Sequence, residues 1–158
     1  MTRIIVASRK QMEATISLDV SHVVISITDP DKPLARIRSQ PKDILRLQFY
    51  DVDEPHDAYY PIDVSDAKRI VAFVGKWWDL ADYLIVHCEA GISRSAGVAA
   101  AISKAMLGTD GIFFDSRAYN PNMTCYSYVL KEFYNYNNKE NHLDKGLYKK
   151  KTKTRRSA

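Results

Sequence analysis

The sequence predicts a single α/β domain in which a central, largely parallel, twisted sheet is flanked by helices. Apolar segments with the length of strands alternate along the chain with segments of helical periodicity, an order typical of parallel sheets. The chain has 158 residues, of which 46% are hydrophobic and 27% are charged. That length and composition are typical of an ordinary globular protein with one buried core.

Four segments are predicted as strands. Residues 3–7 are mostly apolar, and residues 22–27 are almost continuously apolar and β-branched, as expected of a strand buried on both faces. In residues 45–50, apolar and polar side chains alternate with the period of a strand that has one buried face. Residues 83–86 form a compact apolar run after a helical segment.

The helices are predicted from apolar spacing and capping residues. Residues 8–15 favour a short helix, and Asp63 or Ser65 caps a longer one whose apolar residues recur every 3.6 positions. An Ala-rich helix follows over residues 94–107.

Glycine and proline mark the ends of the last two helices. Gly108 is a suitable C-cap for the Ala-rich helix. Asn120 then offers an N-cap, with Pro121 at the first position of the last helix. An apolar stripe from Tyr126 to Phe133 predicts that this helix packs on the core.

The positive charge gathers at the C-terminus. Residues 139–158 contain eight Lys or Arg and two acidic residues, whereas the rest of the chain contains 15 basic and 17 acidic residues. We therefore expect a folded domain of residues 1–144 and a basic, flexible tail of residues 145–158. A sharper interpretation is that this tail binds an anionic partner, either nucleic acid, an acidic membrane or an acidic protein.

The sequence gives no indication of secretion, membrane insertion or metal binding. No apolar run approaches the ~20 residues of a membrane-spanning helix, and the first residues lack the long apolar core of a signal peptide. Cys88 and Cys125 are the only cysteines, too few for a disulfide framework, and they fit a reducing cytoplasm. Cys125 is expected in the core, with a resolving disulfide to Cys88 as the alternative. Four His and two Cys at no ligand-like spacing predict no metal site.

The segment from Val86 to Ala96 contains the residues with the clearest chemistry. It lies between a buried strand and a helix, so it is placed at a helix N-terminus, where unpaired N–H groups favour an anion. A cysteine in such a loop ionises readily, which makes Cys88 a candidate nucleophile. Arg94 returns to the same rim and can hold two phosphate oxygens, while Gly91 permits a tight turn of the backbone between them.

This loop, from His87 and Cys88 through five residues to Arg94 and Ser95, resembles the signature of the cysteine-dependent protein tyrosine phosphatases. The amino-acid sequence of the loop is most similar to that of the dual-specificity branch. The resemblance extends over residues 45–133, because the predicted elements follow the order of that family. It implies a phosphate-binding loop between a strand and a helix N-terminus, and no cofactor or metal.

The resemblance also implies a role for each loop residue. Cys88 would attack phosphorus and form a phosphocysteine intermediate, and Ser95 would stabilise the sulfur when that intermediate breaks down. His87 would orient the loop through a hydrogen bond. The phosphate oxygens would be bound by the loop backbone and the arginine side chain, that is, by Glu89, Ala90, Gly91, Ile92, Ser93 and Arg94.

The leaving oxygen needs a proton, so a carboxylic acid should face the loop. The family places this acid some thirty residues before the cysteine, where the chain has Asp51, Asp53 and Asp57. Asp51 is favoured because it follows the alternating strand directly. Asp53 and Asp57 remain open as alternatives.

The resemblance implies a phosphorylated protein as substrate, in which phosphotyrosine is the first expectation and phosphoserine or phosphothreonine the second. An RNA 5′-phosphatase or a phosphoinositide phosphatase would use the same loop. Phosphoinositide enzymes usually have lysines inside it, however, whereas this loop has the acidic Glu89. A non-catalytic phosphate-binding module and a rhodanese-like sulfurtransferase are the remaining alternatives.

Overall fold

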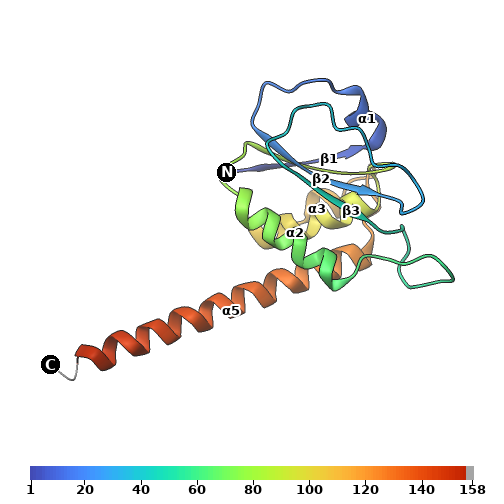
Figure 1. Cartoon of the computed structure of the whole chain (residues 1–158). Coiled ribbons are helices and arrows are strands. Elements are labelled where there is room, and N and C mark those ends of the chain that lie inside the picture. The colour runs from blue at the N-terminus through green and yellow to red at the C-terminus, as the bar shows by residue number, and fades with distance from the viewer. Residues whose placement is uncertain (156–158) are drawn as a thin grey trace.

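The computed structural model describes residues 1–155, with side chains through residue 141. Four strands and five helices make up this part of the chain, arranged as one body from which the last helix extends (Figure 1). In chain order the elements are β1 (Arg3–Ser8), α1 (Arg9–Ala14), β2 (His22–Thr28), β3 (Ile44–Gln48), α2 (Val64–Trp77), β4 (Tyr83–Cys88), α3 (Arg94–Leu107), α4 (Gly111–Phe114) and α5 (Met123–Arg155).

The strands form one sheet in the order β1-β4-β2-β3, and every pair is parallel. The register places Ser8 opposite Cys88 and Ser26 opposite His87. The carboxyl ends of all four strands therefore lie along the same edge of the sheet. The α/β class and the parallel sheet predicted from the sequence are confirmed.

Helices cover the two faces of the sheet unequally. α2, α3 and α5 lie below the sheet in Figure 1, and the larger core forms between them and strand residues such as Val23, Ile25 and Val86. The opposite face is covered by α1 and by the segment between β2 and β3. Its small core consists of Ala7, Met12, Val24 and Ile85. Both faces of β2 are therefore buried, as its β-branched sequence predicts.

Two predicted caps, at Asp63 and Gly108, are present, and Ser8 provides a cap that was not predicted. The side chain of Ser8 accepts the N–H of Gln11 at the start of α1, and that of Asp63 accepts the N–H of Asp66 at the start of α2. Gly108 ends α3 with a φ of 78°. A glycine adopts this left-handed conformation without the strain of a Cβ.

The predicted start of the last helix is wrong by two residues. α5 begins at Met123, and Asn122 caps it by accepting the N–H of Cys125 on Oδ1 at 2.9 Å. Asn120 and Pro121 do not begin the helix, because the N–H of Asn120 donates to the carbonyl of Ile92 at 3.0 Å. Tertiary contact with the loop after β4 therefore overrides the local capping signal.

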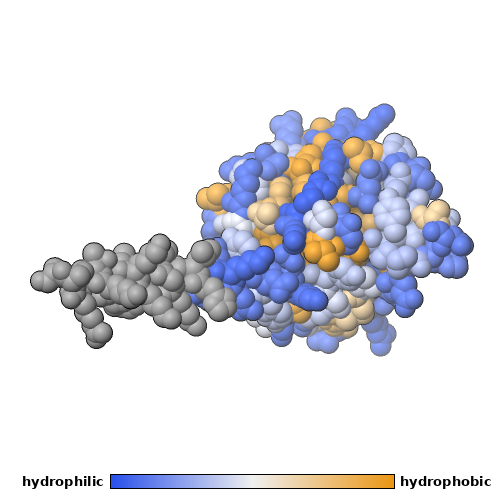
Figure 2. All heavy atoms as spheres, turned by 60° about the horizontal axis from the view of Figure 1, so that its bottom comes forward, coloured by the Kyte–Doolittle hydropathy of each residue, from blue (hydrophilic) through white to orange (hydrophobic). Residues whose placement is uncertain are grey.

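α5 passes beneath the body and continues beyond it (Figure 1). The predicted boundary between residues 1–144 and 145–158 falls inside this helix, where the side chains lie outside the described residues, so it stays a prediction. On the side shown in Figure 2, hydrophobic residues form small separate patches among hydrophilic ones. None of the helices in the described part of the chain has the length and apolar character needed to span a bilayer.

Candidate active site

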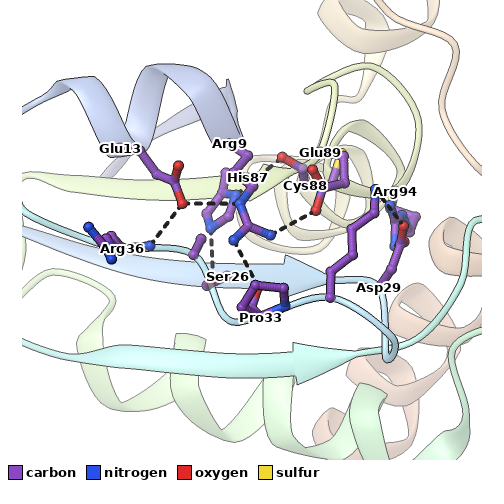
Figure 3. Close-up of polar contacts among 12 residues, drawn as sticks. Arg9, Glu13, Ser26, Asp29, Pro33, Arg36, His87, Cys88, Glu89 and Arg94 are labelled. Atoms are coloured by element: carbon purple, nitrogen blue, oxygen red, sulfur yellow. Dashed lines mark hydrogen bonds and ion pairs between the residues drawn. The ribbon is translucent and has the colours of Figure 1, made fainter.

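The candidate site lies where the parallel strands end. β4 ends at Cys88, and β1 and β2 each end one residue before a charged residue, Arg9 and Asp29 respectively. Asp51 follows three residues after the end of β3. Because ligands bind at the carboxyl ends of the strands in open α/β sheets, this edge is the expected place for a site. Figure 3 shows several of these residues around the end of β4.

Cys88 and Ser95 lie side by side at the bottom of the loop. The Sγ of Cys88 is 3.0 Å from the Oγ of Ser95, and both residues are buried. Ser95 belongs to the first turn of α3, whose N-cap residue, Ser93, makes no capping hydrogen bond with its side chain. The first N–H groups of α3 and the positive end of its dipole therefore face the cysteine region, an arrangement that stabilises negative charge.

Arg94 is held rigidly at the other end of the loop. Its Nη1 donates to the carbonyl oxygen of Phe49 and to Oδ1 of Asp29, both at 2.7 Å, and the residue is only 4% exposed. Its Nε is buried and has no hydrogen-bond partner among the described residues. A buried donor without a partner is costly, so this guanidinium is suited to receive an anion on its Nε side.

His87 stabilises the strand end as a neutral ring. Its Nδ1 lies 3.2 Å from the carbonyl oxygen of Cys88, and its Nε2 lies 2.7 Å from the Oγ of Ser26 on the neighbouring strand. A carbonyl only accepts, so Nδ1 carries the proton and Nε2 accepts from the serine hydroxyl. Burial lowers the pKa of His87, in agreement with an orienting role rather than an ionic one.

Gly91 is the point at which the loop turns against β1. Its φ is 70°, and a Cβ at this position would lie 2.7 Å from the backbone carbon of Ala7. Only a glycine fits both the conformation and the space. Ala90 and Ile92 on either side are exposed at the rim of the loop.

Of the three candidate acids, Asp51 lies against the loop. Its Oδ1 accepts the hydroxyl of Ser93 at 2.8 Å and Nδ2 of Asn122 at 2.9 Å. Asp53 instead accepts the hydroxyl of Thr124 on its backbone oxygen at 3.0 Å. A hollow of about 340 Å³ beside Asp51 is also lined by Asp53, Ser93 and Asn122.

Asp57 lies away from the loop. Its side chain is 81% exposed and pairs with His56 at 3.4 Å. Its φ of 52° places it in a turn, as expected of an aspartate in a polar connection.

Two charged partners of the loop were not predicted from the sequence. Arg9 pairs with Glu89 through Nη1 and Oε1 at 3.1 Å, and Asp29 pairs with Arg94 (Figure 3). The signal that could have found them is their position, because each follows the end of a strand in a parallel sheet. This signal can be used only when the order of the strands in the sheet is known, and the alternation of strands and helices in the sequence does not give that order.

Cys125 lies in the core, as expected. Both cysteines are free and buried. Burial raises the pKa of the Cys125 thiol far above its ordinary value. A thiol of this kind is chemically inert in the folded protein.

No protein family model and no curated protein matches the sequence. The fold is nevertheless similar to solved structures. A single-residue variant of human DUSP28 superposes with a TM-score of 0.61 at 16% identity, covering 86% of this chain and 92% of that one. The chain has the fold of the dual-specificity phosphatases.

Two further structures support this fold. A mouse putative dual specificity phosphatase, solved with zinc tungstate, gives a TM-score of 0.55 at 18% identity, covering 82% of this chain and 79% of that one. PTPMT1 in complex with PI(5)P gives a TM-score of 0.54 at 20% identity, covering 82% of this chain and 88% of that one. The resemblance drawn from the loop sequence is thus confirmed at the level of the fold.

Proposed function

We propose that the protein is a cysteine-dependent phosphatase that hydrolyses phosphotyrosine in proteins through a phosphocysteine intermediate, with phosphoserine and phosphothreonine as the second substrate class. The observation that supports this most strongly is the Cys88–Ser95 pair at the N-terminus of α3, with Arg94 held at the same loop. A site for binding phosphate alone would not require a sulfur nucleophile beside a hydroxyl donor.

In the first step, the Cys88 sulfur attacks phosphorus, so that a P–S bond forms while the bond to the leaving oxygen breaks. Asp51 gives its proton to that oxygen as it leaves. The loop N–H groups and the guanidinium of Arg94 bind the oxygens on which charge is spread in the transition state.

In the second step, a water attacks phosphorus and gives a proton to the Asp51 carboxylate. The P–S bond breaks and the sulfur leaves as a thiolate, which the Ser95 hydroxyl stabilises by donating a hydrogen bond. The Oγ–Sγ distance of 3.0 Å suits this role. Because the nucleophile has to stay reduced, the proposal places the enzyme in a reducing compartment, the cytoplasm.

The charges around the entrance favour a peptide substrate over a polyanion. Residues 51–57 contain four carboxylates, of which Asp51 and Asp53 line the hollow beside the loop. Like charge there would repel an RNA 5′-end or a polyphosphorylated inositol. The Glu89 carboxylate contributes little to this repulsion, because Arg9 pairs with it. Binding of the tail to an anionic partner stays a prediction, since its side chains lie outside the described residues.

Hydrolysis of para-nitrophenyl phosphate in the presence of EDTA tests the reaction. We expect activity in the reduced wild-type protein and none in Cys88→Ser. Activity that persists in Cys88→Ser would refute the cysteine mechanism.

The assignment of the acid is tested with a series of aryl phosphates. General acid catalysis contributes about 10²–10⁴-fold, and most where the leaving group is most basic. The loss in Asp51→Asn should therefore be larger for phenyl phosphate than for para-nitrophenyl phosphate, and Asp53→Asn serves as the matched control. An equal loss for both substrates would remove Asp51 from proton transfer.

The substrate class is tested by comparing phosphate release from phosphotyrosyl, phosphoseryl and phosphothreonyl peptides, 5′-triphosphorylated RNA and phosphoinositides. The structure of PTPMT1 with PI(5)P makes the lipid the rival to include. A kcat/KM for the lipid or the RNA above that for every peptide would overturn the proposed substrate class.

A further inference from the structure

Arg9, the first residue of α1, connects the loop after β4 to its own helix and to the segment between β2 and β3 (Figure 3). The backbone N–H of Arg9 donates to the carbonyl of Glu89 at 3.1 Å, and its Nη1 pairs with the Glu89 carboxylate at the same distance. Its Nη2 donates to the carbonyl of Pro33 at 2.8 Å, and its Nε pairs with Glu13 at 3.1 Å. Each of the three guanidinium nitrogens thus makes a hydrogen bond, and every group it meets is an acceptor.

The pair between Arg9 and Glu89 is only partly solvated. The side chains are 17% and 27% exposed, respectively, so water screens their charges less than those of an ordinary surface pair. Burial is the main cause of the lowered pKa of His87, and among the smaller causes Arg9 lowers that pKa while Glu89 raises it, so both charges act on the residue next to Cys88. An unpaired carboxylate at the first position of the loop would therefore repel a bound phosphate dianion.

We infer that Arg9 is a positioning residue of the phosphate site: it neutralises Glu89 and fixes the first residue of the loop, so that the loop can receive a dianion. The inference rests on the proposed function, because it assumes that phosphate binds in this loop. It assigns to the loop a cation from outside the Cys88–Ser95 segment, directly after β1, one of the two strands that pair with β4.

If Arg9 acts in this way, its charge affects phosphate affinity only because it neutralises the charge of Glu89. Equilibrium binding of inorganic phosphate to the full-length protein, measured by calorimetry, tests this without any need for turnover. We expect Arg9→Gln to weaken phosphate binding about 3- to 10-fold, the size of one partly screened charge near the ligand. Adding Glu89→Gln to that variant should restore the affinity to within about twofold of wild type, because it removes the uncompensated carboxylate.

Two further variants separate charge from folding. Arg9→Lys keeps the positive charge but loses the fork, and we expect its phosphate affinity to stay near that of wild type even where its thermal stability falls. Arg3→Gln makes the same charge change at the opposite end of β1 and should leave binding unchanged. In kinetic assays, Arg9→Gln should raise KM and leave kcat nearly constant.

Three results would overturn the inference. They are wild-type affinity in Arg9→Gln, failure of Glu89→Gln to rescue it, and a loss in Arg9→Lys as large as that in Arg9→Gln. Each is measured on phosphate binding alone, whereas the proposed function fails on the separate result that Cys88→Ser still hydrolyses phosphate esters. The two failures are therefore distinguishable.

Discussion

Asn122 holds two elements of the site together, and Asn122→Ala removes both contacts. Its Oδ1 accepts the N–H of Cys125 and so caps α5, while its Nδ2 donates to the Asp51 carboxylate at 2.9 Å. Loss of an N-cap costs about 1 kcal/mol of stability. Asp51 is exposed and keeps the hydroxyl of Ser93, so water replaces the lost amide at little further cost. We expect a fall of about 1 kcal/mol in the free energy of unfolding, or about 2–4 °C in Tm.

The effect on activity follows from the position of the acid. With one of its two donors removed, the Asp51 carboxyl samples more orientations, and a weakened charged hydrogen bond of about 1 kcal/mol corresponds to a loss of about 5-fold in kcat/KM. The loss should be greater for phenyl phosphate than for para-nitrophenyl phosphate, because the more basic phenolate depends more on a proton at its leaving oxygen. Urea unfolding and steady-state kinetics on the same preparation provide both numbers.

Asn122→Asp separates the two effects. Aspartate is as good an N-cap as asparagine and interacts favourably with the helix dipole, so stability should stay within about 0.5 kcal/mol of wild type. It places a second carboxylate against Asp51, however, and repulsion should reduce activity at least as much as alanine does. Asn120→Ala is the matched control, since Asn120 lines the same hollow and its side chain makes no hydrogen bond among the described residues. Full activity in Asn122→Asp would refute the reasoning.

Three further predictions follow from burial and backbone geometry. Burial lowers the pKa of His87, so its contribution to stability is complete above the unfolded pKa of about 6.5 and is lost as the pH falls below that value. The free energy of unfolding in urea should therefore fall between pH 7.5 and pH 5.5, and it should fall less in His87→Gln. Gly91→Ala should weaken phosphate binding more than about tenfold by displacing the loop, whereas Gly75→Ala, where the Cβ meets nothing within 4 Å, should bind normally and gain about 0.5–1 kcal/mol. Iodoacetamide should modify Cys88 in the native protein and leave Cys125 intact, because burial raises the pKa of the Cys125 thiol; mass spectrometry that finds both modified would contradict this.

Local sequence signals predicted the elements well, because their causes are local. The alternation in residues 45–50 and the helical spacing after Asp63 come from one buried face, and the caps at Asp63 and Gly108 act within one turn. The start of the last helix failed for the opposite reason. The N–H of Asn120 donates to the carbonyl of Ile92, in a loop that is distant in sequence. Rules based on neighbouring residues cannot predict that contact.

The residues of the candidate site also differ in whether local sequence can predict them. The sequence alone places Cys88, Arg94 and Ser95 together, because they belong to one loop and its helix. The sequence favours Asp51 and leaves Asp53 open, since both occupy the same connection. Their tertiary contacts, which no local rule contains, are what distinguish them in the structure. The roles of these residues in catalysis stay predictions until the variants are measured.

A segment with no sequence signature of its own, residues 29–36, supports both ends of the loop. Residues 29–36 support the loop directly at one end and through Arg9 at the other: Asp29 pairs with Arg94, and Pro33 accepts from Arg9, which pairs with Glu89. One short connection thus fixes both ends of the phosphate-binding loop. Such shared support makes substitutions in contact non-additive, so changes in residues 29–36 should alter phosphate affinity through Arg9 and Arg94 together, even though no residue of the segment belongs to the loop.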